Sequence, residues 1–173
     1  MPAKTTPNDS PNRLVGKNYT TPDLVAKVTG RAKYAEDYRA DGMLFAKLLL
    51  SPMPHARVLS IDASEALAMP GVHYVLDGAE LAAATLPMMT GLDHPNVPRR
   101  PLAHEVARYS GEWVVAVVAD TRALAEDAAE AVEIDYEPMP FVLDAEQALA
   151  GGVLVHEAHG SNVLLDRTFV WGE

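Results

Sequence analysis

Residues 113–140 read WVVAVVADTRALAEDAAEAVEIDYEPMP and predict a strand, a helix and a second strand in succession. Residues 113–119 are almost continuously apolar, which is typical of a strand buried on both faces. Asp120 and Thr121 follow, and a short side-chain oxygen here can accept the N–H groups that lack partners in the first turn of a helix. Residues 132–137 then alternate between apolar and acidic side chains, which indicates a second strand with one buried face.

The helix and the second strand each predict a buried side and a solvent side. In the helix, the expected buried stripe is Leu124, Ala128 and Ala131, and the expected solvent face is Arg122, Glu126 and Glu130. In the strand, Val132, Ile134 and Tyr136 point one way, and Glu133, Asp135 and Glu137 point the other way. Pro138 and Pro140 are expected to end the strand, because proline has no N–H for a ladder. The stretch therefore indicates a domain that contains both helix and sheet.

The rest of the chain predicts further short elements without an internal repeat. Residues 14–38 are expected to form an extended lead-in with local turns. Strands are expected over 43–50, 55–61, 72–76 and 106–109, and helices over 63–68, 79–84 and 144–149. Asp62, with Glu65 three residues later, resembles a capping box, and Asp144 can cap the last helix. Short strands of mixed direction with two main helices place the chain in the α+β or mixed α/β class.

Composition also predicts how the chain is divided. Residues 1–13 are rich in Pro, Thr, Asn and Ser and are expected to form a flexible tail. Residues 14–150 are expected to form one domain, and residues 151–173 a departing linker or a partner-binding tail. Residues 85–103 contain four prolines and one glycine. A loop of this length is usually functional or faces a partner, so we expect it on the surface.

Charge and cysteine usage exclude several classes of function. The chain has 14 basic and 24 acidic residues, a net charge of −10 and a pI of about 5.0, which argues against nucleic-acid and anionic-membrane partners. It contains no cysteine, so it can form no disulfide and can supply no thiolate to an iron–sulfur cluster or a zinc ion. No apolar run approaches a membrane span, and residues 1–13 do not resemble a secretory signal. We therefore expect a cytoplasmic protein.

The histidines do not form a convincing catalytic or metal-binding motif. His156 and His159 are three residues apart, but a glycine follows and no third ligand is nearby, so we interpret both as loop histidines. His104 and Glu105 begin an HExxH pattern, but Arg108 stands where the second histidine should be. His55 lies at a strand entrance, where a structural hydrogen bond is expected. The chain has no nucleotide-binding glycine loop and no GxSxG motif, so we assign no catalytic, cofactor-binding or metal-binding residue.

Six short motifs occur together in a fixed order. They are Lys27-Val28-Thr29-Gly30 with Ala32-Lys33-Tyr34 and Asp37; Gly42-Met43-Leu44 with Ser51-Pro52 and His55-Ala56-Arg57; Ser60-Ile61-Asp62 with Ala66 and Pro70-Gly71-Val72; Gly111-Glu112; Ala125 with Ala128; and Asp135-Tyr136-Glu137-Pro138 with Pro140. In order and spacing they resemble the α/β hammerhead domain that opens the molybdenum-binding large subunit of the xanthine dehydrogenase, aldehyde oxidase and aerobic carbon monoxide dehydrogenase family. The likeness runs from about Val15 to Leu149. Trp113 departs from it, since the family usually has proline there.

The resemblance implies an oxidoreductase complex that hydroxylates an activated C–H bond with oxygen from water. In such complexes electrons pass from molybdopterin-bound molybdenum to [2Fe–2S] clusters and often to FAD. The molybdenum pocket, its catalytic glutamate and the pterin contacts lie in later domains, beyond Glu173, so none of those residues is carried over to this chain. The implied partners are the remaining molybdenum-binding domains or subunit, an iron–sulfur subunit and, in some complexes, an FAD subunit. A partner with an export signal would place the complex in the periplasm.

Two principal functions are therefore expected, and a third is weaker. The first is a structural or assembly domain of a molybdenum hydroxylase, inactive by itself, with contact surfaces at residues 1–13, 85–103 and 153–173. The alternative is a free-standing module that binds a small ligand or a protein in an apolar pocket under the loop 85–103. The third is a small independent enzyme that uses His55 or His104.

Overall fold

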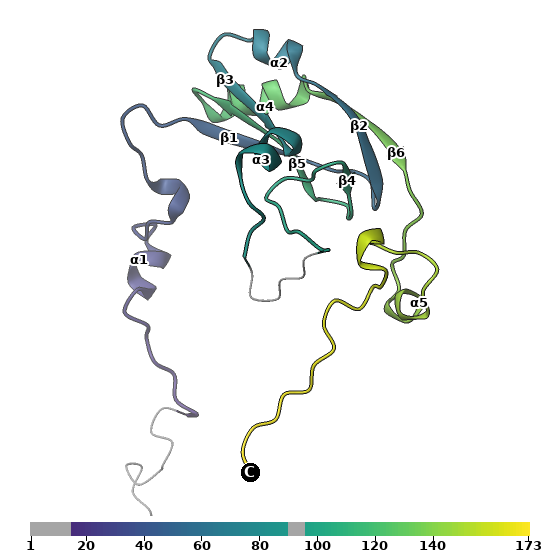
Figure 1. Ribbon diagram of the computed structural model, residues 1–173. Helices are drawn as coiled ribbons and strands as arrows, with labels where there is room; N and C mark the ends of the chain where they lie inside the picture. Colours follow the sequence, from purple (N-terminus) through teal and green to yellow (C-terminus); the bar gives the residue numbers. More distant parts are fainter. Residues whose placement is uncertain (1–14, 90–95) are drawn as a thin grey trace, which may run out of the picture. The chain divides into compact units, whose positions relative to one another are not determined.

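The computed structural model describes residues 15–89 and 96–173 (Figure 1). Its contacts divide the chain into two units, with the boundary in the sequence between Asp41 and Gly42. The predicted tail, residues 1–13, lies outside the described residues, and the predicted domain of residues 14–150 stays a prediction. The first unit contains helix α1 (Leu24–Val28) and the 3-10 turn η1 (Ala35–Asp37), and neither contains a buried residue. The prediction of an extended segment over residues 14–38 did not include α1, because a five-residue helix is too short to produce an apolar period.

The described residues of the second unit form six strands in two three-stranded sheets. The first sheet has the order β1 (Phe45–Leu50), β5 (Trp113–Ala119), β3 (Val72–Asp77), and the second has the order β4 (Val106–Ala107), β2 (Ala56–Asp62), β6 (Glu133–Pro138). All four described pairings are antiparallel, so the mixed strand directions expected from the sequence are not found among them. The two strands of the strand–helix–strand stretch do not lie in the same sheet: β5 belongs to the first sheet and β6 to the second.

Four helices and one 3-10 turn complete this unit. They are α2 (Ser64–Ala68), α3 (Gly78–Ala84), α4 (Arg122–Glu130), α5 (Ala145–Ala150) and η2 (Glu157–His159). Two predicted caps are confirmed: the Thr121 hydroxyl accepts the Leu124 N–H at 3.1 Å, and the Asp144 carboxylate accepts the Gln147 N–H at 2.9 Å. Asp62 accepts the Ser64 N–H at 2.9 Å. A cap at Asp62 would start the helix at Ala63, but α2 begins at Ser64.

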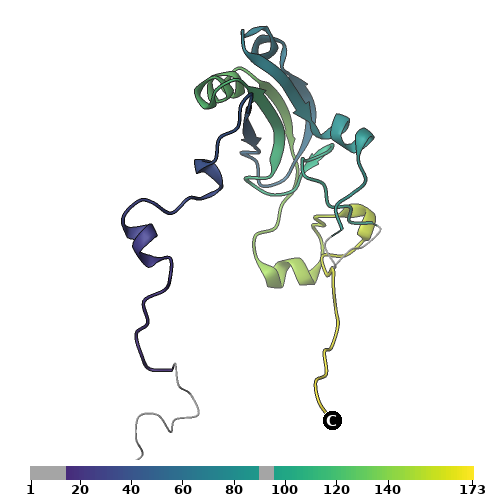
Figure 2. The ribbon, with the colours of Figure 1, turned by 90° about the vertical axis from the view of Figure 1, so that its left-hand side faces the viewer.

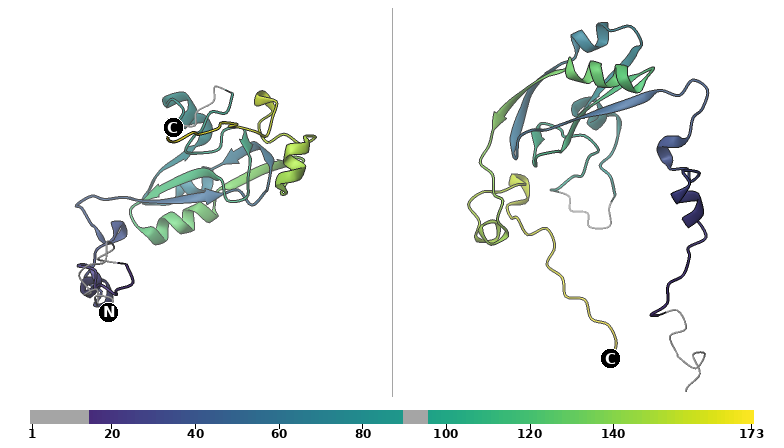
Figure 3. Two further views of the ribbon diagram at one scale, coloured as in Figure 1. Left: turned by 90° about the horizontal axis from the view of Figure 1, so that it is seen from below. Right: turned by 180° about the vertical axis from the view of Figure 1, so that it is seen from behind.

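The core lies where α4 and α2 pack against the sheets, and α4 lies along one face of the first sheet (Figures 2 and 3). It is built mainly from valine and alanine, and Val114, Val115 and Val117 of β5 are completely buried. Adjacent strand residues point to opposite faces, so the burial of both Val114 and Val115 confirms that β5 is covered on both sides. Trp113 is the exception at the strand entrance, because 48% of it remains exposed.

The buried side of α4 differs partly from the predicted stripe. Ala128 is buried as expected, but the other two buried positions of the helix are Ala125 and Ala129, while Leu124 is only half-buried. The helix is therefore rotated so that its smallest side chains face the sheet, which lets helix and sheet approach closely. The expected solvent face, Arg122, Glu126 and Glu130, is exposed, and Lys47 of β1 reaches Glu126 with Nζ 3.3 Å from Oε1. The predicted alternation of β6 is confirmed.

Candidate interaction site

A cavity of about 430 Å³ lies where three segments of the second unit meet. The loop 85–103 contributes Met88, Val97, Pro98, Arg99 and Arg100; the turn between β4 and β5 contributes Arg108, Tyr109 and Glu112; the C-terminal segment contributes Val155, His156 and Leu164. We call it the arginine cavity. Since residues 90–95 lie outside the described part of the chain, its lining is given for the described residues alone.

The second half of the loop 85–103 is anchored to the domain rather than lying freely on its surface. Val97, Leu102 and Ala103 are buried, and the Ala103 N–H donates to the Trp113 carbonyl at 2.7 Å. The Met88 N–H donates to the Arg99 carbonyl at 2.8 Å, which ties the two arms of the loop together. The loop was expected on the surface, and residues 85–89 are exposed, but these buried residues of its second half correct that expectation in part. These contacts also fix the backbone that carries Arg99 and Arg100.

The start of α3 fixes the same backbone from the other side. An added Cβ at Gly78 would lie 1.8 Å from the Ala103 carbonyl oxygen, so only glycine allows the helix to approach the loop this closely. The Asp77 carboxylate accepts the Glu80 N–H at 2.8 Å and holds the first turn of α3 in place. Sequence reasoning predicted this helix but gave no signal of the contact, which is made between residues that are 25 positions apart.

The turn between β4 and β5 positions Arg108 and Glu112. The Glu112 carboxylate accepts the backbone N–H of Arg108, and one terminal nitrogen of Arg108, Nη1, donates to the Val106 carbonyl at 3.1 Å. The Gly111 N–H donates to the Ser51 carbonyl at 2.8 Å and continues the pairing of β1 with β5 past its last ladder residue. The turn is therefore held by hydrogen bonds at both ends.

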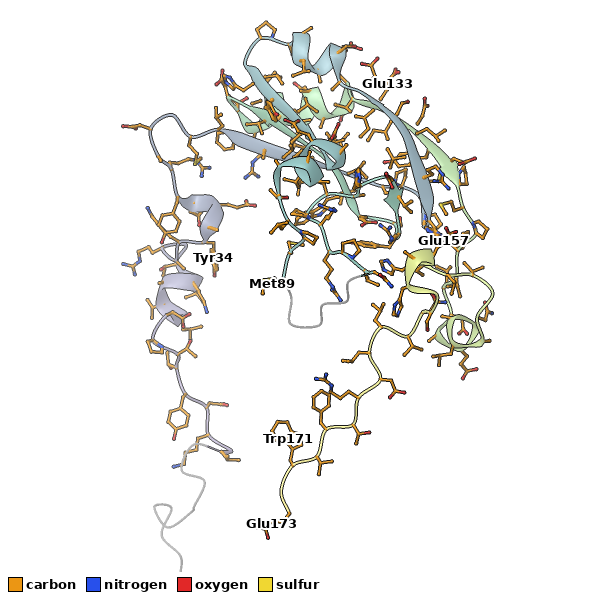
Figure 4. The ribbon with its side chains drawn as sticks, in the orientation of Figure 1. Tyr34, Met89, Glu133, Glu157, Trp171 and Glu173 are labelled. Atoms are coloured by element: carbon orange, nitrogen blue, oxygen red, sulfur yellow. The ribbon has the colours of Figure 1, made fainter. Side chains whose placement is uncertain are left out.

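Asn162 folds the C-terminal segment back toward α5. Its side-chain amide donates to the carbonyls of Ala148 at 3.0 Å and Val153 at 2.8 Å, and its side-chain oxygen accepts the Val155 N–H at 3.0 Å. These bonds place Val155 and His156 in the wall of the arginine cavity. Beyond this fold the chain has neither helix nor strand, and Trp171 projects from an extended segment (Figure 4).

The cavity is positively charged although the chain as a whole is acidic. Among the described lining residues there are three arginines and one carboxylate, that of Glu112, in a chain of net charge −10. Glu105 lines an adjoining hollow with Arg100 and Arg108. Arg100 Nη1 and Arg108 Nε are buried and have no hydrogen-bond partner among the described residues. Burial, followed by the charges of Arg108, His159, Arg99 and His55, lowers the pKa of His156 from 6.5 to about 4. The described lining therefore carries more positive than negative side chains.

The histidines considered in the sequence lie in different settings. His55 is 4% exposed, and its Nδ1 lies 2.7 Å from the Pro140 carbonyl oxygen, which confirms the expected structural hydrogen bond. His104 Nε2 is 3.7 Å from the carboxylate of its neighbour Glu105. His159 lies in η2, with Nε2 3.0 Å from the Val163 carbonyl oxygen. No group of three or more metal-ligating side chains converges among residues 15–89 and 96–173.

Sequence reasoning did not single out Arg99, Arg100 or Arg108 as a group. The one available signal is the adjacent pair Arg99-Arg100 inside a proline-rich loop of an acidic chain. Arg108 entered only as the residue that breaks an HExxH pattern. Nothing local indicates that these side chains share a cavity with His156, because their proximity comes from the fold.

The residues of this chain do not fit an iron–sulfur cluster, since the sequence contains no cysteine. Within the described residues, no helix is long and apolar enough to cross a membrane.

Residues 29–140 match the protein family described as "Aldehyde oxidase and xanthine dehydrogenase, a/b hammerhead domain". Among curated proteins, the nicotine 6-hydroxylase large subunit of Paenarthrobacter nicotinovorans is 37% identical over 153 residues, which are 87% of this chain and 19% of that protein. The carbon monoxide dehydrogenase large chain of Afipia carboxidovorans is 40% identical over 120 residues, 69% of this chain and 15% of that protein.

Solved structures give the same result. Quinoline 2-oxidoreductase from Pseudomonas putida 86 matches with a TM-score of 0.76 and 35% identity, over 87% of this chain and 20% of that one. The aldehyde oxidoreductase from Desulfovibrio gigas matches with a TM-score of 0.69 and 33% identity, over 82% of this chain and 16% of that one. The chain thus spans about a fifth or less of the length of these relatives.

Proposed function

Because the chain belongs to the a/b hammerhead domain family of aldehyde oxidase and xanthine dehydrogenase, we propose that it is a structural and assembly domain of a molybdenum hydroxylase and is not catalytic by itself. The observation that carries this proposal is the extent of the match. The family model covers residues 29–140, yet the chain spans only about a fifth of relatives whose names include "xanthine dehydrogenase molybdenum-binding subunit". We assign the hydroxylation chemistry to the remaining four fifths of such a subunit, which this chain does not include.

The proposed complex contains molybdenum bound to molybdopterin, [2Fe–2S] clusters and, in some members, FAD, all held outside this chain. Its partners are the remaining molybdenum-binding domains or subunit, an iron–sulfur subunit and, where FAD is used, an FAD subunit. The hammerhead domain is proposed to cover residues 14–150, and residues 151–173 to form a linker or partner-binding tail. The proposed compartment is the cytoplasm. Support for an assembly role comes from the arginine cavity, which is formed by loops and whose described lining has three arginines and one carboxylate.

An exchange experiment tests this function. The matching stretch of the nicotine 6-hydroxylase large subunit of Paenarthrobacter nicotinovorans is replaced by this chain, and native mass spectrometry and metal analysis report complex mass and molybdenum content. The expected result is a complex of the parent's mass with molybdenum close to the parent's content. A parent subunit that lacks the stretch serves as the control and should lose assembly. A chimera that is folded by circular dichroism but neither assembles nor retains molybdenum would contradict the proposal.

A free-standing binding module is the second candidate, because the loop 85–103 does line a cavity with apolar walls. This candidate requires tight binding of a ligand by the isolated chain, without any partner. A thermal-shift screen of the isolated chain against small organic acids and heterocycles separates the two candidates. A large, saturable stabilisation by one compound favours the module, and no stabilisation by any of them favours the assembly domain.

A further inference from the structure

The described lining of the arginine cavity contains three arginines, Arg99, Arg100 and Arg108, and one carboxylate, that of Glu112. Arg100 Nη1 and Arg108 Nε are inaccessible to solvent and have no hydrogen-bond partner among the described residues, whereas Arg108 Nη1 donates to the Val106 carbonyl. A buried charged donor without an acceptor is strongly unfavourable, so such groups in native proteins are almost always paired. The carboxylate of Glu112 also lines the cavity, but it accepts the backbone N–H of Arg108. Among the described lining residues, guanidinium groups therefore outnumber carboxylates by three to one.

The neighbouring acidic group is not part of the described lining of this cavity. Glu105 lines an adjoining hollow together with His104, Arg100 and Arg108, and its carboxylate lies 3.7 Å from His104 Nε2. Glu105 also has a φ of 65°, in the left-handed region that residues other than glycine rarely adopt. Its carbonyl accepts the Val58 N–H at 2.8 Å, so the strained backbone is held by β2. The Glu105 backbone is thus held by β2, while its carboxylate, on a side chain that is 75% exposed, lies near His104.

The shape and lining of the cavity favour a side chain of a polypeptide over a free ion. At about 430 Å³ the cavity has room for more than one small anion, and the side chains of Val97, Tyr109 and Val155 form apolar parts of its wall. A free phosphate would leave that apolar wall in contact with water. An aspartate or glutamate next to an apolar residue covers the wall and also matches the planar fork of a guanidinium group.

From these observations we propose that the arginine cavity receives an aspartate or glutamate side chain, flanked by an apolar residue, from the remainder of the molybdenum-binding subunit. This inference rests on the proposed assembly function and names the chemistry of the contact. Arg100 and Arg108 bind the carboxylate, and the apolar wall packs against its neighbour. The pKa of His156 is lowered first by burial and then by neighbouring positive charges, Arg108 foremost, and a bound carboxylate would offset the second of these causes.

A peptide titration of the 173-residue chain tests the cavity directly. The probes are acetyl-Leu-Glu-Leu-amide, its glutamine counterpart and inorganic phosphate, and NMR follows the side-chain N–H signals of Arg100 and Arg108 and the imidazole signals of His156. The glutamate peptide is expected to bind saturably, about tenfold or more tightly than the glutamine peptide. It should also shift the imidazole signals of His156, which lines the cavity. The variants R100Q and R108Q should each abolish the preference for glutamate.

Arg57→Gln is the matched control, because Arg57 lies outside the cavity and pairs with Glu137, Nε to Oε2 at 3.3 Å. It should leave the preference unchanged, and a backbone NMR spectrum shows that each variant is folded. Equal binding of both peptides, an unchanged preference in R100Q and R108Q, or displacement of the glutamate peptide by phosphate at equal concentration would overturn the proposal.

The exchange experiment separates this inference from the proposed function. In the nicotine 6-hydroxylase chimera, the double variant R100Q/R108Q is expected to lose most of the assembled complex, while R57Q keeps it. If the double variant assembles like the unsubstituted chimera, the arginine contact is refuted and the assembly function stands. If the unsubstituted chimera itself fails to assemble, the assembly function fails, and the peptide titration still decides what the cavity binds.

Discussion

Replacing Gly78 by alanine should destabilise the domain, although alanine is the better helix former. In an open helix this change stabilises by up to about 1 kcal/mol, because glycine loses more backbone freedom on folding. Here the new Cβ would lie 1.8 Å from the Ala103 carbonyl oxygen and 2.6 Å from its carbonyl carbon. Both are backbone atoms, so no side-chain rotation relieves the clash. Reaching an ordinary contact of 3.4 Å requires α3 and the loop to separate by 1.6 Å.

A shift of that size disrupts the contacts that anchor the loop. The hydrogen bond from the Ala103 N–H to the Trp113 carbonyl would be stretched or broken, and Leu102, now 3% exposed, would move out of the core. Overpacking of this kind costs about 2–3 kcal/mol, which corresponds to a fall in Tm of roughly 10 °C for a domain of this size. Urea unfolding followed by circular dichroism measures the change in the free energy of unfolding.

Ala83→Gly in the same helix is the matched control, because Ala83 is exposed. It should cost only about 1 kcal/mol, the difference in helix propensity. G78A should also shift the NMR signals of Arg100 and Arg108, since the loop carries the first of them and borders the second. A G78A variant as stable as the unsubstituted chain, or more stable, would refute the close approach of α3 and the loop.

Three further predictions concern the core, a helix cap and a titrating group. Val117→Ala removes two methyl groups from a completely buried position and should cost about 2–3 kcal/mol in urea unfolding, whereas the same change at the exposed Val170 should cost almost nothing. Thr121→Ala removes the acceptor of the Leu124 N–H and should cost about 1 kcal/mol, and a Thr121→Ser variant that is equally destabilised would contradict the capping role. The pKa of His156 is lowered to about 4, so between pH 6.5 and 4 the unfolded chain takes up a proton that the folded chain does not. Stability is therefore complete above pH 6.5 and falls by about 1–2 kcal/mol toward pH 4, a value reduced for partial exposure, and H156Q should remove this component of the pH dependence.

Local sequence patterns predicted the elements that depend on neighbouring residues. The apolar run 113–119, the cap at Thr121 and the alternation of β6 each follow from side chains a few positions apart, and the structure confirms all three. The orientation of α4 was predicted less well, because Leu124 is the most apolar residue of that helix and sequence patterns favour burying it. Close packing against the sheet instead selects the alanines at 125, 128 and 129.

Features that depend on distant residues were not predictable from these patterns. The placement of β5 and β6 in separate sheets is decided by pairings with β1, β3 and β2, which no local period encodes. The arginine cavity joins residues from positions 88 to 164, and its charge is opposite to that of the chain as a whole. Family resemblance supplied the fold and the expected enzyme class, but it indicated nothing about this cavity.

The central claim is that the chain is a self-folding structural domain whose molybdenum chemistry lies elsewhere in a larger enzyme. The most direct measurement is the molybdenum content of the purified 173-residue chain, expressed in cells that assemble molybdenum enzymes and shown to be folded by a cooperative thermal transition. We predict a folded protein with molybdenum at background level. A folded chain that carries molybdenum in a near-stoichiometric amount would contradict the account.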